Sequence, residues 1–138
     1  MKYWDSSALL PLLVHEPASA RMTKVLEDDP AIVTWWGTTI ECVSAIARLE
    51  RDKALDSAGV RDALARLRAV AETWTEVPAV PLVREQATRL LRLHPLRAGD
   101  AVQLAAAIVA ADFEPGSLEF VTLDTRQATA AEREGFRA

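Results

Sequence analysis

Short segments rich in β-branched and aromatic residues alternate along this chain with longer segments whose apolar residues recur at helical spacing. The clearest expected strands are 2–4, 31–35 and 118–123. Residues 75–80 are ambiguous, because Pro78 favours an edge strand or an extended linker. Strands that alternate with helices favour a parallel sheet with helices on both faces. The pattern therefore predicts an α/β fold.

Seven segments are expected to be helical. They run over about 8–14 after a cap at Ser6 or Ser7, 19–27, from a cap at Thr38 or Thr39 to about 51, from Asp56 or Ser57 to about 74, 81–93, 101–111 and 125–134. Pro11 is expected near the first turn of its helix, where a missing N–H costs least. The segment 101–111 is apolar nearly all round, which places it in the centre of the fold. Gly135 stops the last helix, and 136–138 is expected to begin one further short strand.

The length of 138 residues predicts one domain, covering residues 1–138. No apolar run approaches the ~20 residues of a membrane span, so no contact with a membrane is expected. Asp5 interrupts the N-terminus before the apolar region of a signal peptide can form. The single cysteine, Cys42, excludes an internal disulfide and fits a reducing compartment. We therefore expect a cytoplasmic protein.

The net charge of −4 provides no overall basic field of the kind that indicates a nucleic-acid-binding protein. Thirteen of the 16 basic residues are nevertheless arginine, the better bidentate partner of phosphate. Arginine also pairs with acids on helix surfaces. Composition by itself leaves nucleic-acid binding undecided.

Four acids stand where a helix is expected to begin: Asp5, Glu41, Asp100 and Asp124. Asp5 and Asp124 suit helix N-caps, and Glu41 follows Thr38 at the spacing of a capping box. Asp100 in a first turn gains ~0.3–1 kcal/mol from the helix dipole. In a right-handed parallel sheet, however, helices that follow strands start at one edge. Asp5, Glu41 and Asp124 are therefore expected along one rim. Asp100 opens the central helix beneath it.

Carboxylates gathered in this way repel one another, by about 4 kcal/mol for two charges ~4 Å apart at an effective dielectric near 20. A fold tolerates such repulsion where a proton is shared or a cation is bound. Oxygen ligands without a His or Cys cluster favour Mg²⁺ (or Mn²⁺). Sites of this kind commonly activate water for attack on a phosphodiester. The residues thus predict a carboxylate–metal site.

Four motifs along the chain carry a resemblance to a known family. They are Asp5–Leu9, Thr38–Glu41 with Ala45 and Arg48, Gly99–Ala101 with Leu104–Ala107, and Val121–Asp124. Together they resemble the PIN-domain ribonucleases, and most closely the VapC toxins of prokaryotic type II toxin–antitoxin pairs. The resemblance covers nearly the whole chain, and although each motif alone is loose, their order is fairly specific. It implies a three-layer α/β/α sandwich with a central parallel sheet, an endoribonuclease activity and Mg²⁺ or Mn²⁺ as cofactor.

The resemblance also implies roles for the acids. Asp5 and Asp100 would be the surest metal ligands. Glu41 would be the third acid, binding the metal directly or through water and orienting the nucleophile. Asp124 would be the fourth and most variable acid. The hydroxyl residues expected to hold ligands or waters in place beside these acids are Ser6 and Thr122.

The partners expected from the resemblance are an RNA substrate, a cognate antitoxin protein and a second copy of the chain in a homodimer. Gln127 is more polar than the family leads us to expect, and it is not expected to touch the acids. One alternative is a PIN-like module that has lost catalysis and only binds a partner. Another is a phosphotransfer domain that uses Asp5 as nucleophile, which is disfavoured because no second acid lies two residues after Asp5.

Overall fold

Four short parallel strands form the centre of the fold. They are β1 (Lys2–Trp4), β2 (Ile32–Trp35), β3 (Thr75–Val77) and β4 (Glu119–Val121). In the computed structural model, which describes residues 1–138, they lie in the order β3-β2-β1-β4 and all pairs are parallel. Tyr3 of β1 is in register with Val33 on one side and with Phe120 on the other. Asp5 therefore emerges from the interior of the sheet.

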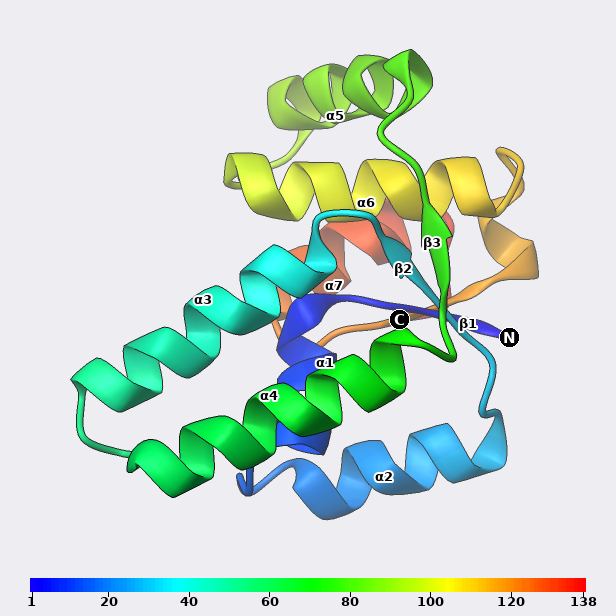
Figure 1. The fold of residues 1–138 in the computed structure, drawn as a ribbon. Coiled ribbons are helices and arrows are strands. Elements are labelled where there is room, and N and C mark those ends of the chain that lie inside the picture. Colours follow the sequence, from blue (N-terminus) through cyan, green and yellow to red (C-terminus); the bar gives the residue numbers. More distant parts are fainter.

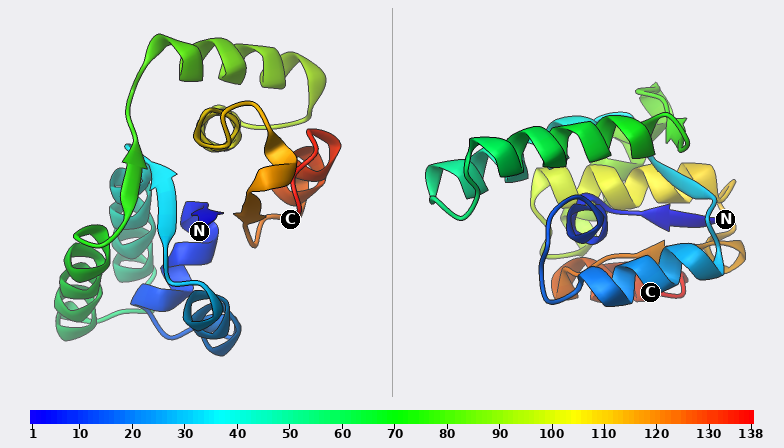
Figure 2. Two further views of the ribbon diagram at one scale, coloured as in Figure 1. Left: turned by 90° about the vertical axis from the view of Figure 1, so that its right-hand side faces the viewer. Right: turned by 60° about the horizontal axis from the view of Figure 1, so that its bottom comes forward.

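Helices cover both faces of this sheet (Figures 1 and 2). One layer consists of α1 (Ser6–Leu13), α2 (Ser19–Asp28), α3 (Thr38–Arg51) and α4 (Ser57–Ala71). The opposite layer consists of α5 (Pro81–Leu93), α6 (Ala98–Ala110) and α7 (Thr125–Arg133). The expected three-layer α/β/α sandwich with a parallel sheet is thus confirmed. None of the helices combines the length and the apolar character that crossing a bilayer requires.

Alternation along β1 divides the core between the two faces of the sheet. Tyr3 packs with Val33 and Phe120 against the layer of α5, α6 and α7. Its neighbour Trp4 packs against the layer of α1 to α4. Helix α6 lies between α5 and the sheet and is buried along most of its length, as its apolar sequence predicts. This packing leaves the residue after Trp4, Asp5, at the carboxyl end of a buried strand.

The path of the chain places a topological switch point of the sheet beside Asp5. From β1 the chain moves through β2 to the edge strand β3, with helices of one layer as connections. It then returns through α5 and α6 in the other layer and adds β4 on the far side of β1. The connection from β1 therefore leads to β2 on one side of it, whereas β4 lies on the other side of β1 and is reached from the opposite layer of helices. In open α/β sheets ligands bind outside the carboxyl ends of strands at such a switch point.

The helix starts decide between the caps that the sequence leaves open. Asp5, which also suits a helix N-cap by its sequence, is the N-cap of α1 in place of Ser6 or Ser7, and its Oδ2 accepts a 3.1 Å hydrogen bond from the Ser7 backbone N–H. Pro11 lies inside α1 and not in its first turn, so the helix lacks one internal hydrogen bond there. Helix α3 is preceded by Gly37, not by a capping threonine. A side chain at Gly37 would clash with the Trp35 indole.

The remaining boundaries are close to those expected. Residues 75–77 form the edge strand that Pro78 allows, and Pro81 occupies the first turn of α5. Helix α4 ends at Ala71, three residues earlier than expected, and α6 begins three residues earlier than expected, at Ala98. After α7 the chain turns at Gly135, whose φ of +100° lies in the left-handed region. The expected last strand is reduced to a single bridge between Arg137 and Glu119.

Candidate active site

Asp5 is held at the end of β1 by hydroxyl groups from two elements. Its backbone N–H continues the sheet by donating to the Val121 carbonyl, and the residue is only 3% exposed. Its Oδ2 accepts hydrogen bonds from the Ser7 hydroxyl (2.5 Å) and from the Thr122 hydroxyl (3.1 Å). Burial raises the pKa of the Asp5 carboxyl, and the hydrogen bonds from Ser7 and Thr122 offset part of that rise.

Glu41, in the first turn of α3, is linked to Asp5 by the Ser6 hydroxyl, which lies within hydrogen-bond distance of both carboxylates. Its Oε2 accepts a 2.9 Å hydrogen bond from the Ser6 hydroxyl, and its Oε1 accepts one of 2.9 Å from the Gln103 amide. Burial raises the pKa of Glu41 against these two hydrogen bonds, and the nearby charges of Asp5 and Asp100 raise it further. The capping-box interpretation of Glu41 is therefore wrong, because its carboxylate is bound by side chains of α1 and α6.

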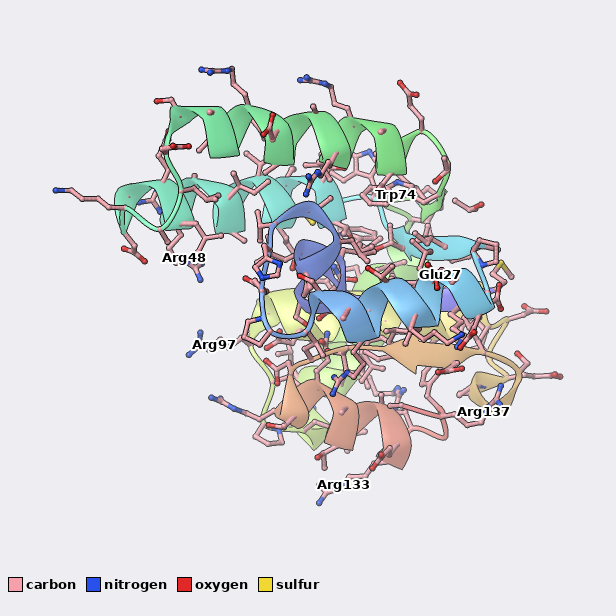
Figure 3. All side chains as sticks on the ribbon, turned by 90° about the horizontal axis from the view of Figure 1, so that it is seen from below. Glu27, Arg48, Trp74, Arg97, Arg133 and Arg137 are labelled. Carbon is pink, nitrogen blue, oxygen red and sulfur yellow. The ribbon has the colours of Figure 1, made fainter.

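Glu41 and Asp100 face the same cavity, which has a volume of about 460 Å³. The lining residues are Ser6, Ile40, Glu41, Ser44, Ala45, Arg48 and Asp100. Arg48 and Arg97 project from the same end of the molecule (Figure 3), and neither forms an ion pair with an acid. The cavity thus combines two carboxylates with one unpaired guanidinium, a combination suited to a metal-assisted reaction at a phosphate.

Asp124 lies at the periphery of this arrangement. It is the N-cap of α7, as expected, and its Oδ1 accepts hydrogen bonds from the backbone N–H groups of Arg126 (2.9 Å) and Gln127 (3.2 Å). Its own backbone N–H donates to the Thr122 hydroxyl, which also contacts Asp5. Asp124 does not line the cavity of Glu41 and Asp100. The structure therefore places Glu41 and Asp100 on one cavity, with Asp5 beside Glu41 through the Ser6 hydroxyl, and leaves Asp124 outside that cavity.

A comparison with protein families identifies the fold. The family described as PIN domain matches residues 2–133. The chain belongs to the PIN domain family. No curated protein matches it. PIN domains are generally nucleases that use divalent metal ions, so membership supports a hydrolase that acts on nucleic acid.

The donor atoms at the rim of this PIN domain fit a hard divalent cation in their chemistry. All of the acids offer oxygen ligands, and Oδ1 of Asp100 accepts no hydrogen bond from the protein. No three acidic, histidine or cysteine side chains converge closely enough to form a coordination cluster. Hydroxyl and amide groups instead hold Asp5 and Glu41 separately.

Sequence reasoning missed a set of buried polar side chains that support the acids. Thr34, Thr38, Gln103 and Gln127 are all fully buried. Gln103 interrupts the apolar sequence of α6 three residues after Asp100, and that spacing on one helix face was the available signal. Against expectation Gln127 contacts one of the acids, because its backbone N–H donates to Asp124 Oδ1 at 3.2 Å, but its side chain reaches no carboxylate. Its Nε2 donates to the Asp100 backbone carbonyl at 3.3 Å.

The lone cysteine does not take part in the site. Cys42 follows Glu41 on α3 but its side chain is fully buried among apolar residues of the α1–α4 layer. Burial, with the charges of Glu41 and Asp5, raises the pKa of the Cys42 thiol to about 12. A thiol with so high a pKa is protonated at neutral pH and a poor nucleophile.

Proposed function

We propose that this PIN domain is a metal-dependent endoribonuclease that hydrolyses RNA phosphodiester bonds at the carboxylate rim. The observation that carries the proposal is that Glu41 and Asp100 face one cavity, with Asp5 near enough for its charge to raise the pKa of Glu41. Charges of one sign are costly to gather, and a bound divalent cation removes that cost.

The acids have separate roles in this proposal. Asp5 and Asp100 bind Mg²⁺ or Mn²⁺, and Glu41 binds it directly or through water while it orients the attacking water. Asp124 supplies a fourth carboxylate beside them. When bound, such an ion lowers the pKa of a water molecule and neutralises charge that develops on the phosphate. Ser6 and Thr122 hold the carboxylates of Glu41 and Asp5 through the hydrogen bonds described above.

Arg48 is proposed to bind a phosphate of the RNA. It lines the cavity with Glu41 and Asp100 and forms no ion pair within the chain. A guanidinium matches two phosphate oxygens at once, which would fix the scissile bond beside the carboxylates. The arginine thus provides positive charge where a protein of net charge −4 needs it to bind RNA.

We further propose that the chain is the toxin of a type II toxin–antitoxin pair of the VapC type and acts as a homodimer. The order of its four motifs supports the toxin assignment. Exposed apolar side chains in and just before the first turns of α3 support a protein partner: Trp36 is 54% exposed, Ile40, which lines the cavity, 64% and Val43 41%. An antitoxin would cover such a surface and direct a basic side chain to the acids.

Cleavage of RNA by the purified protein tests the ribonuclease proposal. Wild type is expected to cleave RNA with Mn²⁺ or Mg²⁺ and to stop when the ion is chelated, whereas Asp100→Asn is expected to be inactive. Equal cleavage by the two proteins would rule out the proposed site. If the chain were a binding module without catalysis, Mn²⁺ would not raise its melting temperature, because no ion would stabilise the native state.

The toxin assignment needs a test in cells. Induced expression of wild type is expected to arrest growth, while Asp100→Asn is expected to be tolerated at the same protein level. Coexpression of the product of a short neighbouring open reading frame should restore growth. Growth unaffected by wild type at a level that cleaves RNA in vitro would contradict the toxin role and leave the nuclease proposal standing.

A further inference from the structure

Two glutamine side chains are completely buried next to the acids, Gln103 on α6 and Gln127 on α7. An amide removed from water is unfavourable unless its donors and acceptor are satisfied, and an apolar residue would fill the same space without that requirement. The Gln103 amide uses its oxygen and both N–H groups, the Gln127 amide uses its oxygen and one N–H, and their partners lie in or next to the segments that carry the acids.

The orientation of the Gln103 amide is fixed by its partners. The Tyr3 hydroxyl lies 2.7 Å from Gln103 Oε1 and donates to it. The two amide hydrogens then point to the Thr38 hydroxyl and to Glu41 Oε1, each at 2.9 Å. If the amide were flipped, its oxygen would face the Glu41 carboxylate. Both groups are acceptors, so no proton would lie between them. The Glu41 carboxylate, which can only accept, therefore sets which end of Gln103 it meets, and the Tyr3 hydroxyl donates to the other end.

A chain of hydroxyl groups continues from Gln103 to β1. Thr38 accepts from Gln103 and donates to Thr34 at 2.7 Å, and Thr34 donates to the Trp4 carbonyl at 2.7 Å. The direction follows because the Trp4 carbonyl can only accept. Trp4 directly precedes Asp5. One buried network thus joins α6 beside Asp100, α3 with Glu41 and β1 with Asp5.

Gln127 makes the corresponding connection on the other side of β1. Its Nε2 donates to the Asp100 carbonyl at 3.3 Å, and its Oε1 lies 2.9 Å from the Thr122 hydroxyl. That hydroxyl is also 3.1 Å from Asp5 Oδ2, so its single proton serves one of these acceptors at a time. Gln127 therefore ties the start of α6 to the end of β4.

We propose that Gln103 and Gln127 are positioning residues that set the spacing of the acids for the cation. Gln103 acts most directly, because its amide holds one oxygen of Glu41 and leaves the carboxylate in a fixed orientation. This inference rests on the proposed function, since it assigns the two amides a role in that site. Outer partners of metal ligands commonly change metal affinity by about 10–100-fold when removed.

The test is the dissociation constant of Mn²⁺, measured by calorimetric titration of the full chain, together with its melting temperature. Gln103→Met keeps the size of the side chain and removes its hydrogen bonds, and it is expected to weaken Mn²⁺ binding by about tenfold or more. Gln127→Met is expected to weaken it less. Leu67→Ala is the control, because it opens a cavity under α4, which carries none of the acids. It should lower the melting temperature with Mn²⁺ affinity unchanged.

The outcomes separate this inference from the proposed function. Mn²⁺ affinity of Gln103→Met equal to that of wild type would overturn the positioning role, while the nuclease proposal would stand. Mn²⁺ affinity of Asp100→Asn equal to that of wild type would overturn the proposed site itself. If Gln103→Met does not fold, Tyr3→Phe replaces it, because it removes the anchor of the Gln103 amide and leaves that amide in place. Wild-type affinity in Tyr3→Phe would then count against the inference.

Discussion

The amide nitrogen of Gln103 donates a 2.9 Å hydrogen bond to Oε1 of Glu41, a residue 62 positions earlier in the chain. This contact joins α6, which begins with Asp100 in its first turn, to α3, which carries Glu41 in its first turn. The relative position of two of the proposed ligands is therefore determined by a side chain that is not itself a ligand.

Replacement of Asp5 is expected to stabilise the protein at neutral pH in the absence of divalent ions. The raised pKa of Asp5 means that the folded state holds its proton more tightly than the unfolded state does. Stability from this group is present below its unfolded pKa and is lost as the pH rises through its folded pKa. Asp5→Asn, which can still cap α1, should therefore be more stable than wild type at pH 8.

Thermal unfolding with a chelator at pH 4 and at pH 8 checks this prediction. The advantage of Asp5→Asn should be larger at pH 8 than at pH 4, because the raised pKa leaves more of the wild-type carboxyl protonated at the lower pH. Added Mn²⁺ should stabilise wild type and leave the variant unchanged. A variant less stable than wild type at both pH values would show that Asp5 is retained for folding.

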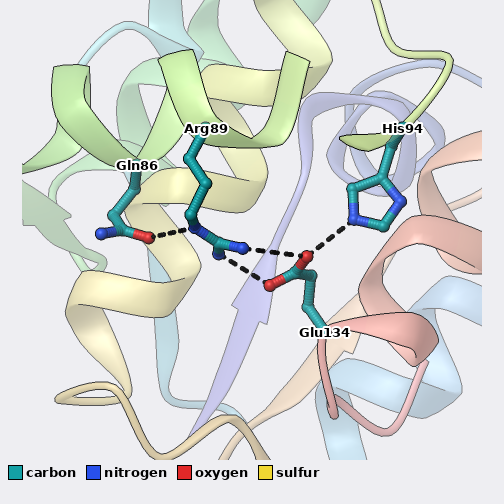
Figure 4. Close-up of polar contacts among 4 residues, drawn as sticks. All are labelled: Gln86, Arg89, His94 and Glu134. Carbon is teal, nitrogen blue, oxygen red and sulfur yellow. Dashed lines mark hydrogen bonds and ion pairs between the residues drawn. The ribbon is translucent and has the colours of Figure 1, made fainter. Parts of the chain in front are cut away.

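Glu134 gives the opposite pH dependence. Its Oε2 lies 2.7 Å from Arg89 Nη2 and its Oε1 lies 2.7 Å from His94 Nε2 (Figure 4). The Gln86 side-chain oxygen accepts a further hydrogen bond from Arg89. Burial alone would raise the pKa of Glu134, but the hydrogen bonds from Arg89 and His94 lower it overall. Stability from this carboxylate is present above its unfolded pKa and is lost as the pH falls through its folded pKa.

Glu134→Gln should therefore cost about 1–2 kcal/mol at pH 7, and less as the solution is acidified. The measurement is urea unfolding of both proteins between pH 3 and pH 7. Because the contacts of Glu134 lie at the far end of α7 from Asp124, RNA cleavage by the variant should match wild type wherever both are folded. A constant stability difference across this pH range would show that the charge of Glu134 is not what stabilises the contact.

Ser6→Ala should reduce RNA cleavage by about tenfold or more. The Ser6 hydroxyl is the donor to Glu41 Oε2, so its removal leaves the carboxylate held only at Oε1. Single-turnover cleavage rates at saturating Mn²⁺ give the effect on the chemical step. Ser44 lines the same cavity but makes no hydrogen bond to an acid, so Ser44→Ala is the matched control. A similar loss in both variants would contradict the specific role of Ser6.

Arg48→Ala should weaken RNA binding more than it slows cleavage of bound RNA. A lost phosphate contact also lowers the salt dependence of binding, by about 0.7 in the logarithmic slope for a single strand. The slope is measured from RNA binding at several salt concentrations, with each arginine substitution made in the inactive Asp100→Asn protein. Arg51→Ala, on the same helix but outside the cavity, should leave it unchanged. Equal slopes for Asp100→Asn alone and for its combinations with Arg48→Ala and with Arg51→Ala would exclude a phosphate contact at Arg48.

Local sequence patterns predicted the fold because they reflect local physics. Strand and helix periodicity located the elements of the sheet and both layers, and Asp5 was recognised as a possible cap. The same local reasoning failed for Glu41. Its spacing from Thr38 imitates a capping box, whereas its real partners, Ser6 and Gln103, are distant in the chain. Buried amides cannot be interpreted from sequence until their partners are known.

The structure distinguishes Asp124 from the other three acids. Burial raises the pKa of Glu41 most, and the charges of Asp5 and Asp100 raise it further. Asp124 is occupied as a helix cap and separated from them by Thr122. Asp124→Asn should therefore reduce cleavage less than Asp100→Asn, because asparagine still caps α7. Equal loss in the two variants, measured at saturating Mn²⁺, would contradict this ranking.

A crystal structure with Mn²⁺ tests the central claim most directly, because anomalous scattering locates the ion independently of any assay. The account predicts one strong peak at the carboxylate rim, with oxygens of Asp5 and Asp100 about 2.1 Å from it and Glu41 bound directly or through water. The carboxylates would have moved together relative to their present spacing. A fully loaded crystal with no peak between Asp5 and Asp100 would contradict the account.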